Sequence, residues 1–133
     1  MRIAIFDCPL GIAGDMTVGA LLDGGMPFGL LKEEIGKLGL QGYSLDLRNV
    51  RSGVFRAKKF EVKLRPYTAH HHVSLREIEN KIRSSRLHSE IKKKAAAIFR
   101  KLGQAEAQVH GIPLQKVHFH EVGAVDAIVD VVG

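Results

Sequence analysis

The spacing of the apolar residues changes twice along the chain, and this change most constrains the fold. Around residues 30–38 and 75–109, apolar residues recur every three or four positions, the spacing of an amphipathic helix with one buried face. Between them, over residues 43–47, apolar and polar residues alternate, which indicates a half-buried strand. For 133 residues this pattern predicts a single α+β domain of two layers, in which a small mixed or antiparallel sheet with a β-hairpin packs against four to five helices.

Start and stop signals place the elements of the first part of the chain. Residues 2–6 are an apolar run, which is typical of a buried strand. Asp15 is expected to cap a helix that ends at Gly24, because its side chain can accept from free backbone N–H groups. Pro27 suits the start of a second helix, where a missing N–H costs nothing.

A β-hairpin is expected between residues 43 and 65. Residues 51–53 form its turn, with Gly53 at a position that tolerates a positive φ. On the return strand the apolar residues change parity at Lys58-Lys59. This change predicts a β-bulge at these two lysines.

Capping signals mark the helices that follow. Ser74 and Glu77 have the spacing of a capping box, in which each side chain accepts from a backbone N–H of the other residue. A long helix is predicted at 89–110, ended by Gly111. Its predicted buried stripe consists of Ile91, Ala95, Ile98, Leu102, Ala105 and Val109.

The last residues are apolar and have no closing signal. Residues 117–120 are interpreted as a short strand, and 122–133 favour a helix over a strand although several of them are β-branched. No cap, charge run or proline ends this last element. We therefore interpret residues 1–133 as one domain that forms the N-terminal part of a longer protein.

Basic residues are concentrated in the middle of the chain, which has a net charge of +6. Residues 48–65 carry seven basic side chains and one acidic one, a basic ribbon that suits a polyanion or a small phosphate-bearing ligand, or is an ordinary solvated face. Nucleic acid is disfavoured, because no Trp and few other aromatic residues are present for stacking. The chain has no apolar run of membrane-spanning length, no stretch of signal-peptide character and one cysteine, Cys8, so we expect a cytoplasmic protein without disulfides.

Two histidines near the end of the chain form the strongest candidate metal site. On a strand, His118 and His120 point to the same side and offer two imidazoles to one metal ion. Glu121 can add an oxygen ligand or orient an imidazole. Asp126 and Asp130 share one face of the predicted helix and can supply further carboxylates. The alternative is the exposed side of an edge strand beside a solvated stripe of acids.

Three more histidines, His70, His71 and His72, lie in a segment without periodicity. Residues 65–73 are therefore predicted to form a flexible loop. Because imidazoles bind nickel, zinc and copper, the triplet either captures a metal ion or belongs to an ordinary polar loop.

A glycine-containing loop follows the first apolar run. Asp7, Gly11, Gly14 and Asp15 surround a turn that is similar to a phosphate cradle, since glycine turns and helix N-termini bind anions. Two carboxylates would repel a bare phosphate, so a divalent cation between them is needed to reconcile these features. The alternative is a tight turn in front of a capped helix.

Taken together, these motifs resemble the LarC nickel-insertion family over the whole chain. The matching residues are Phe6-Asp7-Cys8, Gly11-Ile12-x-Gly14-Asp15-Met16, Gly19-Ala20-Leu21-Leu22-Asp23, Ala105-Glu106-Ala107-x-Val109-His110-Gly111 and Val117-His118-Phe119-His120-Glu121-Val122-Gly123-Ala124-Val125-Asp126-x-Ile128-Val129-Asp130. The histidine-rich segment after the hairpin is also typical of the family. The sequence departs from the family at Pro9-Leu10, where Phe-Ser is usual, and this removes a hydroxyl and a backbone donor.

The resemblance implies insertion of Ni²⁺ into a pyridinium bis-thiocarboxylate mononucleotide, the precursor of the nickel-pincer cofactor of lactate racemase. In the family this is a lyase-class reaction driven by CTP hydrolysis with Mn²⁺ or Mg²⁺, and CTP binding is attributed to a separate C-terminal domain. The implied partners are the anionic mononucleotide, that C-terminal domain and the lactate racemase apoprotein. Assembly as a homo-oligomer is a further possibility.

A mechanistic hypothesis follows for the candidate residues. Nickel is held by His118, His120 and Glu121, or is relayed to them by the histidines at 70–72. Forming a nickel–carbon bond requires a base for the ring proton, and Glu121, Asp126 or a histidine can take it. The basic ribbon attracts the mononucleotide. The alternative is a nickel carrier that binds the metal without catalysing insertion.

Overall fold

The computed structural model describes residues 3–65, 73–119 and 125–133. Over these residues it contains five α-helices, one 3-10 turn and two antiparallel two-stranded ladders, which confirms the predicted α+β fold. The order is α1 (Gly14–Asp23), α2 (Phe28–Gly36), β1 (Tyr43–Ser52), β2 (Phe55–Leu64), β3 (Val73–Ser74), α3 (Leu75–Ser84), α4 (Ser89–His110), η1 (Leu114–Lys116), β4 (His118–Phe119) and α5 (Val125–Val132).

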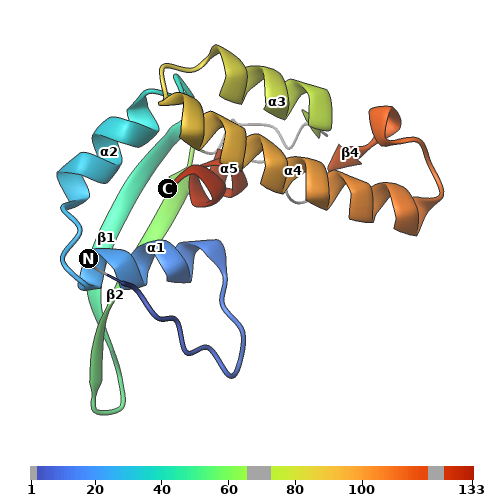
Figure 1. Cartoon of the computed structure of the whole chain (residues 1–133). Helices are drawn as coiled ribbons and strands as arrows, with labels where there is room; N and C mark the ends of the chain where they lie inside the picture. The colour runs from blue at the N-terminus through green and yellow to red at the C-terminus, as the bar shows by residue number, and fades with distance from the viewer. Residues whose placement is uncertain (1–2, 66–72, 120–124) are drawn as a thin grey trace.

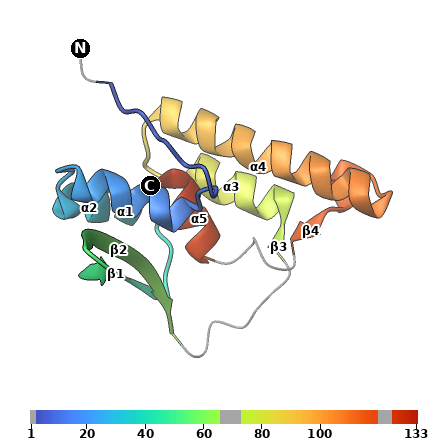
Figure 2. The same cartoon turned by 90° about the horizontal axis from the view of Figure 1, so that it is seen from below.

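The structure has two layers, the β1–β2 hairpin and the helices on one of its faces (Figure 1, Figure 2). α1 packs against β2, and α5 contacts α1, α4 and β2, so the last helix sits at the centre of the helical layer. α3 and α4 pack against each other. The largest fully buried side chains of the common core are Phe60, Phe99, Phe119, Leu22, Ile35, Ile78, Ile82 and Ile128.

The hairpin is regular, and the predicted β-bulge at Lys58-Lys59 is wrong. Cα pairing runs without interruption from Tyr43 opposite Leu64 to Ser52 opposite Phe55. The change of parity has another cause. Lys58 lies on the same face as the buried Phe60, and its Nζ donates to the Leu22 carbonyl oxygen at 3.1 Å, at the C-terminal end of α1. A cation at a helix C-terminus is favourable, so a lysine replaces an apolar residue there without a change of register.

The first apolar run is not a buried strand. Residues 3–6 have no regular secondary structure, and the side chain of Ile5 is 89% exposed. A buried strand needs a neighbouring strand for its backbone and a covered face for its side chains. Within the described residues nothing supplies the first, because the two ladders pair β1 with β2 and β3 with β4.

The start of α1 also differs from the prediction, whereas its end agrees. The N-cap residue is Ala13, and Asp15 lies in the first turn, where its carboxylate accepts from the Met16 backbone N–H at 2.8 Å. A carboxylate in the first turn is still favourable, because it opposes the positive end of the helix dipole. Gly24 caps the C-terminus as expected.

The limits of α4 agree with the sequence, and its buried face agrees in part, since Ala95 of the predicted stripe is buried. Phe99 is fully buried, whereas Ile98 of the predicted stripe is 50% exposed. Burial depends on α3, α5 and η1, which contact α4 on the face that carries Ala95, Phe99 and Gly103. The Ser74–Glu77 capping box and the terminal helix are both confirmed. No helix in the described part of the chain is long and apolar enough to cross a membrane.

Candidate functional site

The short β3–β4 ladder holds the described part of the predicted metal site. Val73 pairs with Phe119, and Ser74 pairs with His118. Phe119 is buried and His118 is exposed, the alternation that the sequence predicted. His120, Glu121 and the histidines at 70–72 lie outside the described residues.

The ladder also relates two segments that the sequence left unconnected. Val73 directly follows the histidine triplet in the chain, and Phe119 directly precedes His120. Because Val73 and Phe119 are paired, the two histidine segments are attached to neighbouring points of the structure. Sequence analysis missed this, since a two-residue strand has too few residues to show a period.

Glu77 is a carboxylate near His118 that the sequence analysis treated only as a helix cap. Its Oε2 accepts from the backbone N–H and the hydroxyl of Ser74, both at 2.7 Å. These donors hold the pKa of the Glu77 carboxyl below its usual value, with smaller contributions from Lys81 and His118. An ionised carboxylate in the first turn of α3 therefore lies close enough to the exposed His118 imidazole of β4 to interact with it.

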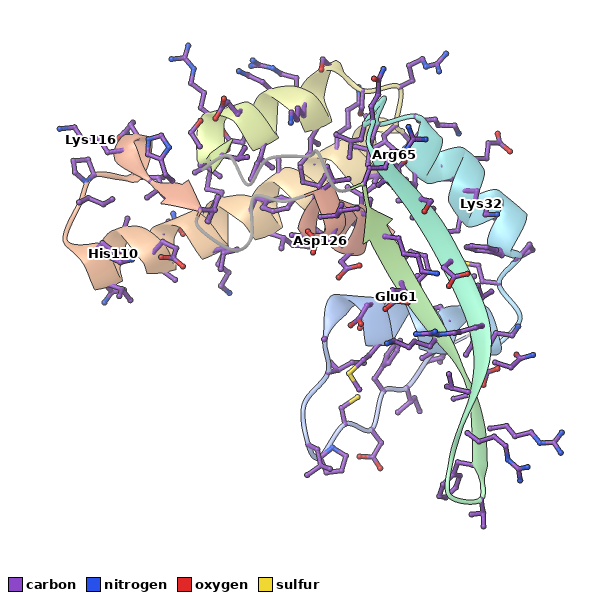
Figure 3. The ribbon with its side chains drawn as sticks, turned by 180° about the vertical axis from the view of Figure 1, so that it is seen from behind. Lys32, Glu61, Arg65, His110, Lys116 and Asp126 are labelled. Atoms are coloured by element: carbon purple, nitrogen blue, oxygen red, sulfur yellow. The ribbon has the colours of Figure 1, made fainter. Side chains whose placement is uncertain are left out.

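A second cluster of candidate residues lies where the N-terminus of α1 meets α5. A Cβ added to Gly14 would lie 2.7 Å from the Cβ of Asp130, so only glycine allows this approach. The Asp130 carboxylate accepts from the backbone N–H of Asp15, while its Oδ1 is buried and has no hydrogen-bond partner within the described structure. Asp126, one turn earlier on α5, is half-buried and is labelled in Figure 3.

Asp130 has the largest pKa shift among the described residues. Burial raises the pKa of its carboxyl to about 6, and the nearby carboxylates of Asp15 and Asp126 add to the increase. The backbone N–H of Asp15 acts in the opposite direction. A carboxyl with this pKa can hold or release a proton near neutral pH. The helical spacing of Asp126 and Asp130 was visible in the sequence, but the contact with Asp15 was not.

The predicted phosphate cradle is divided by the fold. Gly14 and Asp15 reach α5, whereas Asp7 and Gly11 lie in the exposed segment before α1. The Gly11 backbone N–H donates to the Cys8 carbonyl oxygen at 3.0 Å, which closes a turn in this segment. A ligand role for the four residues together therefore stays a prediction.

The basic ribbon of residues 48–65 is partly neutralised. Arg48 and Lys59 both form ion pairs with Glu61, which is labelled in Figure 3, and Lys63 pairs with Asp46. These pairs are exposed, so each contributes little to stability. Within residues 3–65, 73–119 and 125–133, no three His, Cys, Asp or Glu side chains are grouped so that they could hold a metal ion.

Comparison with known proteins defines the family. The profile of the family described as nickel insertion protein matches residues 4–133, and this chain belongs to that family. A protein of Citrifermentans bemidjiense that is named a nickel insertion protein is 48% identical over 134 residues, which cover 100% of this chain and 34% of that protein.

A second relative has a more specific name. The pyridinium-3,5-bisthiocarboxylic acid mononucleotide nickel insertion protein of Geobacillus kaustophilus is 45% identical over 140 residues, which cover 99% of this chain and 34% of that protein. The chain thus spans about a third of the length of the curated relatives it matches. No solved structure shows significant similarity to it.

Proposed function

We propose that this chain handles nickel for insertion into a pyridinium bis-thiocarboxylate mononucleotide, in the biosynthesis of the nickel-pincer cofactor of lactate racemase. The observation that carries this proposal is the match to nickel insertion proteins over residues 4–133. One relative is named for that mononucleotide, which supports the choice of substrate.

The proposed nickel ligands come from both sides of the β3–β4 ladder. His118, His120 and Glu121 bind Ni²⁺, and the histidines at 70–72 deliver it. Imidazole and carboxylate donors suit this metal. The pairing of Val73 with Phe119 supports the proposal. Val73 follows the histidine triplet and Phe119 precedes His120, so the two segments are attached to the ladder at adjacent positions.

The proposed proton transfer uses the carboxylates of the same motif. Binding nickel to carbon displaces a ring proton, and Glu121 or Asp126 accepts it. Asp130 supports Asp126 in this role, because a carboxyl with a pKa of about 6 beside it can take up the proton in turn.

The reaction of the whole protein is proposed by analogy with the family. CTP with Mn²⁺ or Mg²⁺ binds to a C-terminal domain, and the complete protein acts in the cytoplasm as a lyase that serves the lactate racemase apoprotein. The length of the relatives is consistent with a further domain, since this chain covers 34% of them.

Calorimetric titration of the chain with Ni²⁺ tests the metal proposal. The wild type should bind nickel, and the double variant His118→Ala/His120→Ala should bind it at least about tenfold more weakly. His110→Ala is the matched control, because His110 belongs to neither histidine segment and pairs with Glu106 on α4. Absence of binding by the wild type, or equal weakening in the control, would refute the assigned ligands.

Adding the mononucleotide distinguishes a nickel carrier from a nickel insertion protein. A carrier binds Ni²⁺ whether or not the pyridinium mononucleotide is present, and forms no nickel–sulfur or nickel–carbon bond. An insertion protein, mixed with nickel, mononucleotide and CTP in its complete form, gives the metallated product, which has its own absorption spectrum. Nickel binding without any product in the complete protein would favour the carrier.

A further inference from the structure

Two exposed apolar surfaces lie at one end of the molecule. The tip of the β1–β2 hairpin and the segment of residues 3–12 both project beyond α1, at the lower end of Figure 1 and Figure 3, and they lie on opposite sides of this helix in Figure 2. At the tip, Val54 is 84% and Phe55 is 75% exposed, and in the segment Leu10 is fully exposed. Exposed apolar side chains that are grouped rather than scattered mark interaction surfaces.

The hairpin tip is also basic, and its charges are not neutralised. Arg51 and Arg56 are exposed and stand directly opposite each other on the two strands, where like charges repel. Among the described residues neither has a carboxylate within ion-pair distance. Further along the hairpin, by contrast, Arg48 is paired with Glu61. The tip therefore presents an unneutralised arginine pair beside its apolar side chains.

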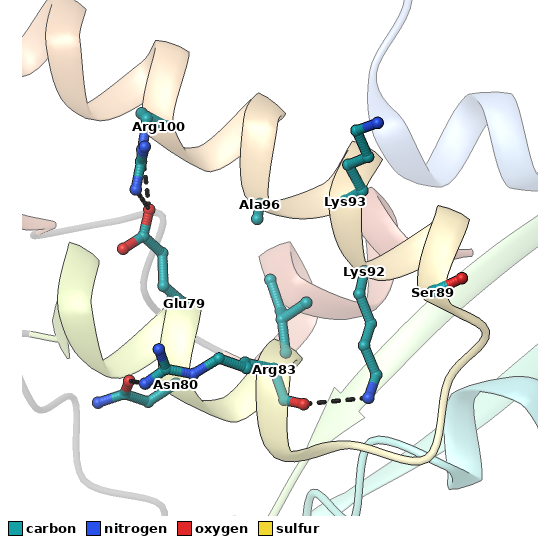
Figure 4. A pocket seen from close by; sticks show the side chains of 9 residues that line it. Glu79, Asn80, Arg83, Ser89, Lys92, Lys93, Ala96 and Arg100 are labelled. Atoms are coloured by element: carbon teal, nitrogen blue, oxygen red, sulfur yellow. Dashed lines mark hydrogen bonds and ion pairs between the residues drawn. The ribbon is translucent and has the colours of Figure 1, made fainter.

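Arginines between α3 and α4 contrast with this pair, because they meet acceptors within the chain. The Arg100 guanidinium donates to Glu79 Oε1 through Nε at 3.1 Å and through an Nη atom at 2.8 Å (Figure 4). Arg83 donates to the side-chain oxygen of Asn80 in the same region. The arginine pair at the tip has no such acceptor in the part of the chain that the structure describes, so it is available to a second molecule.

The surface on the other side of α1 has the opposite charge. Residues 3–23 contain Asp7, Asp15 and Asp23 and no basic residue, whereas residues 48–59 of the hairpin contain five basic residues and no acidic one. Asp7 is exposed and has no hydrogen-bond or ion-pair partner within the described structure. The two surfaces are thus complementary in charge, but α1 separates them within one chain.

We propose that the hairpin tip of one copy of this chain binds the segment of residues 3–12 of a second copy, and that the second copy makes the same contact in return. A two-fold axis then closes the assembly as a dimer. The arginine pair faces Asp7 of the other copy, while Val54 and Phe55 pack on its apolar side chains. Arginine and aromatic residues contribute most to such interfaces. A polyanion would bind the tip but leave the acidic segment without a partner.

Sedimentation velocity from about 5 to 500 µM tests the dimer, with a chelator present so that metal ions cannot bridge histidines. The wild type should form a reversible dimer, more at about 0.05 M salt than at about 0.5 M, because salt screens exposed charges. Arg51→Glu/Arg56→Glu should weaken dimerisation at least about tenfold. Lys94→Glu/Lys101→Glu gives the same net charge by changes at exposed positions of α4, and should alter dimerisation less than about twofold.

A mixture of two variants tests which surfaces meet. Asp7→Lys alone should weaken dimerisation, and an equal mixture of this variant with Arg51→Glu/Arg56→Glu should restore it, because both contacts then join opposite charges. Phe55→Ala should weaken dimerisation at least about fivefold. Ile98→Ala, which shortens an exposed apolar side chain of α4, should leave it unchanged. All of these side chains are exposed, so the thermal melting temperatures of the monomers should stay close to the wild-type value.

Four outcomes would overturn the proposal. A wild type that stays monomeric over this range would leave the two surfaces to another partner, such as a further domain. Assemblies larger than a dimer would exclude the reciprocal contact. Equal weakening by the two double variants would mean that only general charge acts. A mixture of the two variants that stays monomeric would show that the hairpin tip and Asp7 do not meet.

Discussion

β4 and α5 come from one continuous sequence motif, yet the fold places them in opposite environments. In β4, His118 is exposed on a two-residue ladder. In α5, Asp130 is packed against Gly14 with one carboxylate oxygen buried. An exposed imidazole can exchange ligands with solvent, whereas a shielded carboxyl has a raised affinity for protons. The comparison indicates that one motif supplies both an exposed imidazole and a carboxyl with a raised affinity for protons.

The largest expected effect within β4 concerns the residue next to the histidine. Phe119 is 2% exposed, so Phe119→Ala should lower the free energy of unfolding by about 3–5 kcal/mol, through lost burial and the cavity that remains. His118→Ala should change it by less than about 0.5 kcal/mol, because His118 is exposed. Urea denaturation measures both. Similar losses in the two variants would show that the two faces of β4 are not distinct.

The contact between α1 and α5 should be the next most sensitive point. Gly14→Ala places a methyl group 2.7 Å from the Asp130 Cβ, and the necessary shift should cost about 1–3 kcal/mol. Gly29→Ala is the matched control, since nothing lies within 4 Å of the added Cβ and alanine favours helix. The control should be neutral or stabilising in the same urea experiment. A stable Gly14→Ala variant would contradict the close approach of the two helices.

Replacing the buried carboxyl should have a smaller effect that depends on pH. The pKa of Asp130 is about 6 in the folded chain against an ordinary value of 3.8, so the fold favours the protonated form. The contribution of this carboxyl to the free energy of unfolding is complete below pH 3.8 and is lost as the pH rises through 6. Asp130→Asn, which cannot ionise, should therefore gain stability relative to the wild type over this interval. Allowing for solvent screening, we expect about 1 kcal/mol above pH 7.

The matched variant for this prediction is Asp126→Asn on the same helix. It should also stabilise the chain, but less, because the Asp126 carboxylate acts on Asp130 through its charge alone. Denaturation midpoints between pH 4 and 8 measure both variants. A constant difference between Asp130→Asn and the wild type over this range would show that Asp130 does not titrate there.

The sequence by itself determined the local elements, because their signals act over a few residues. Gly24, Gly111 and the Ser74–Glu77 capping box end or begin helices where they were expected. Alternation over residues 43–47 identified the hairpin, and the family motif identified the region around His118 as a candidate site. Backbone hydrogen bonds and capping contacts need no distant partner, so the chain specifies them locally.

The tertiary structure alone decided which faces are buried and which distant residues meet. Phe99 rather than Ile98 faces the core because α3 and α5 lie on that side of α4. Residues 3–6 are apolar enough for a buried strand, yet within the described structure they have no neighbouring strand to pair with. The contact of Asp130 with Gly14 joins residues more than a hundred positions apart. A local pattern records that a side chain can be buried, but only packing selects its partner, since burial depends on what covers it.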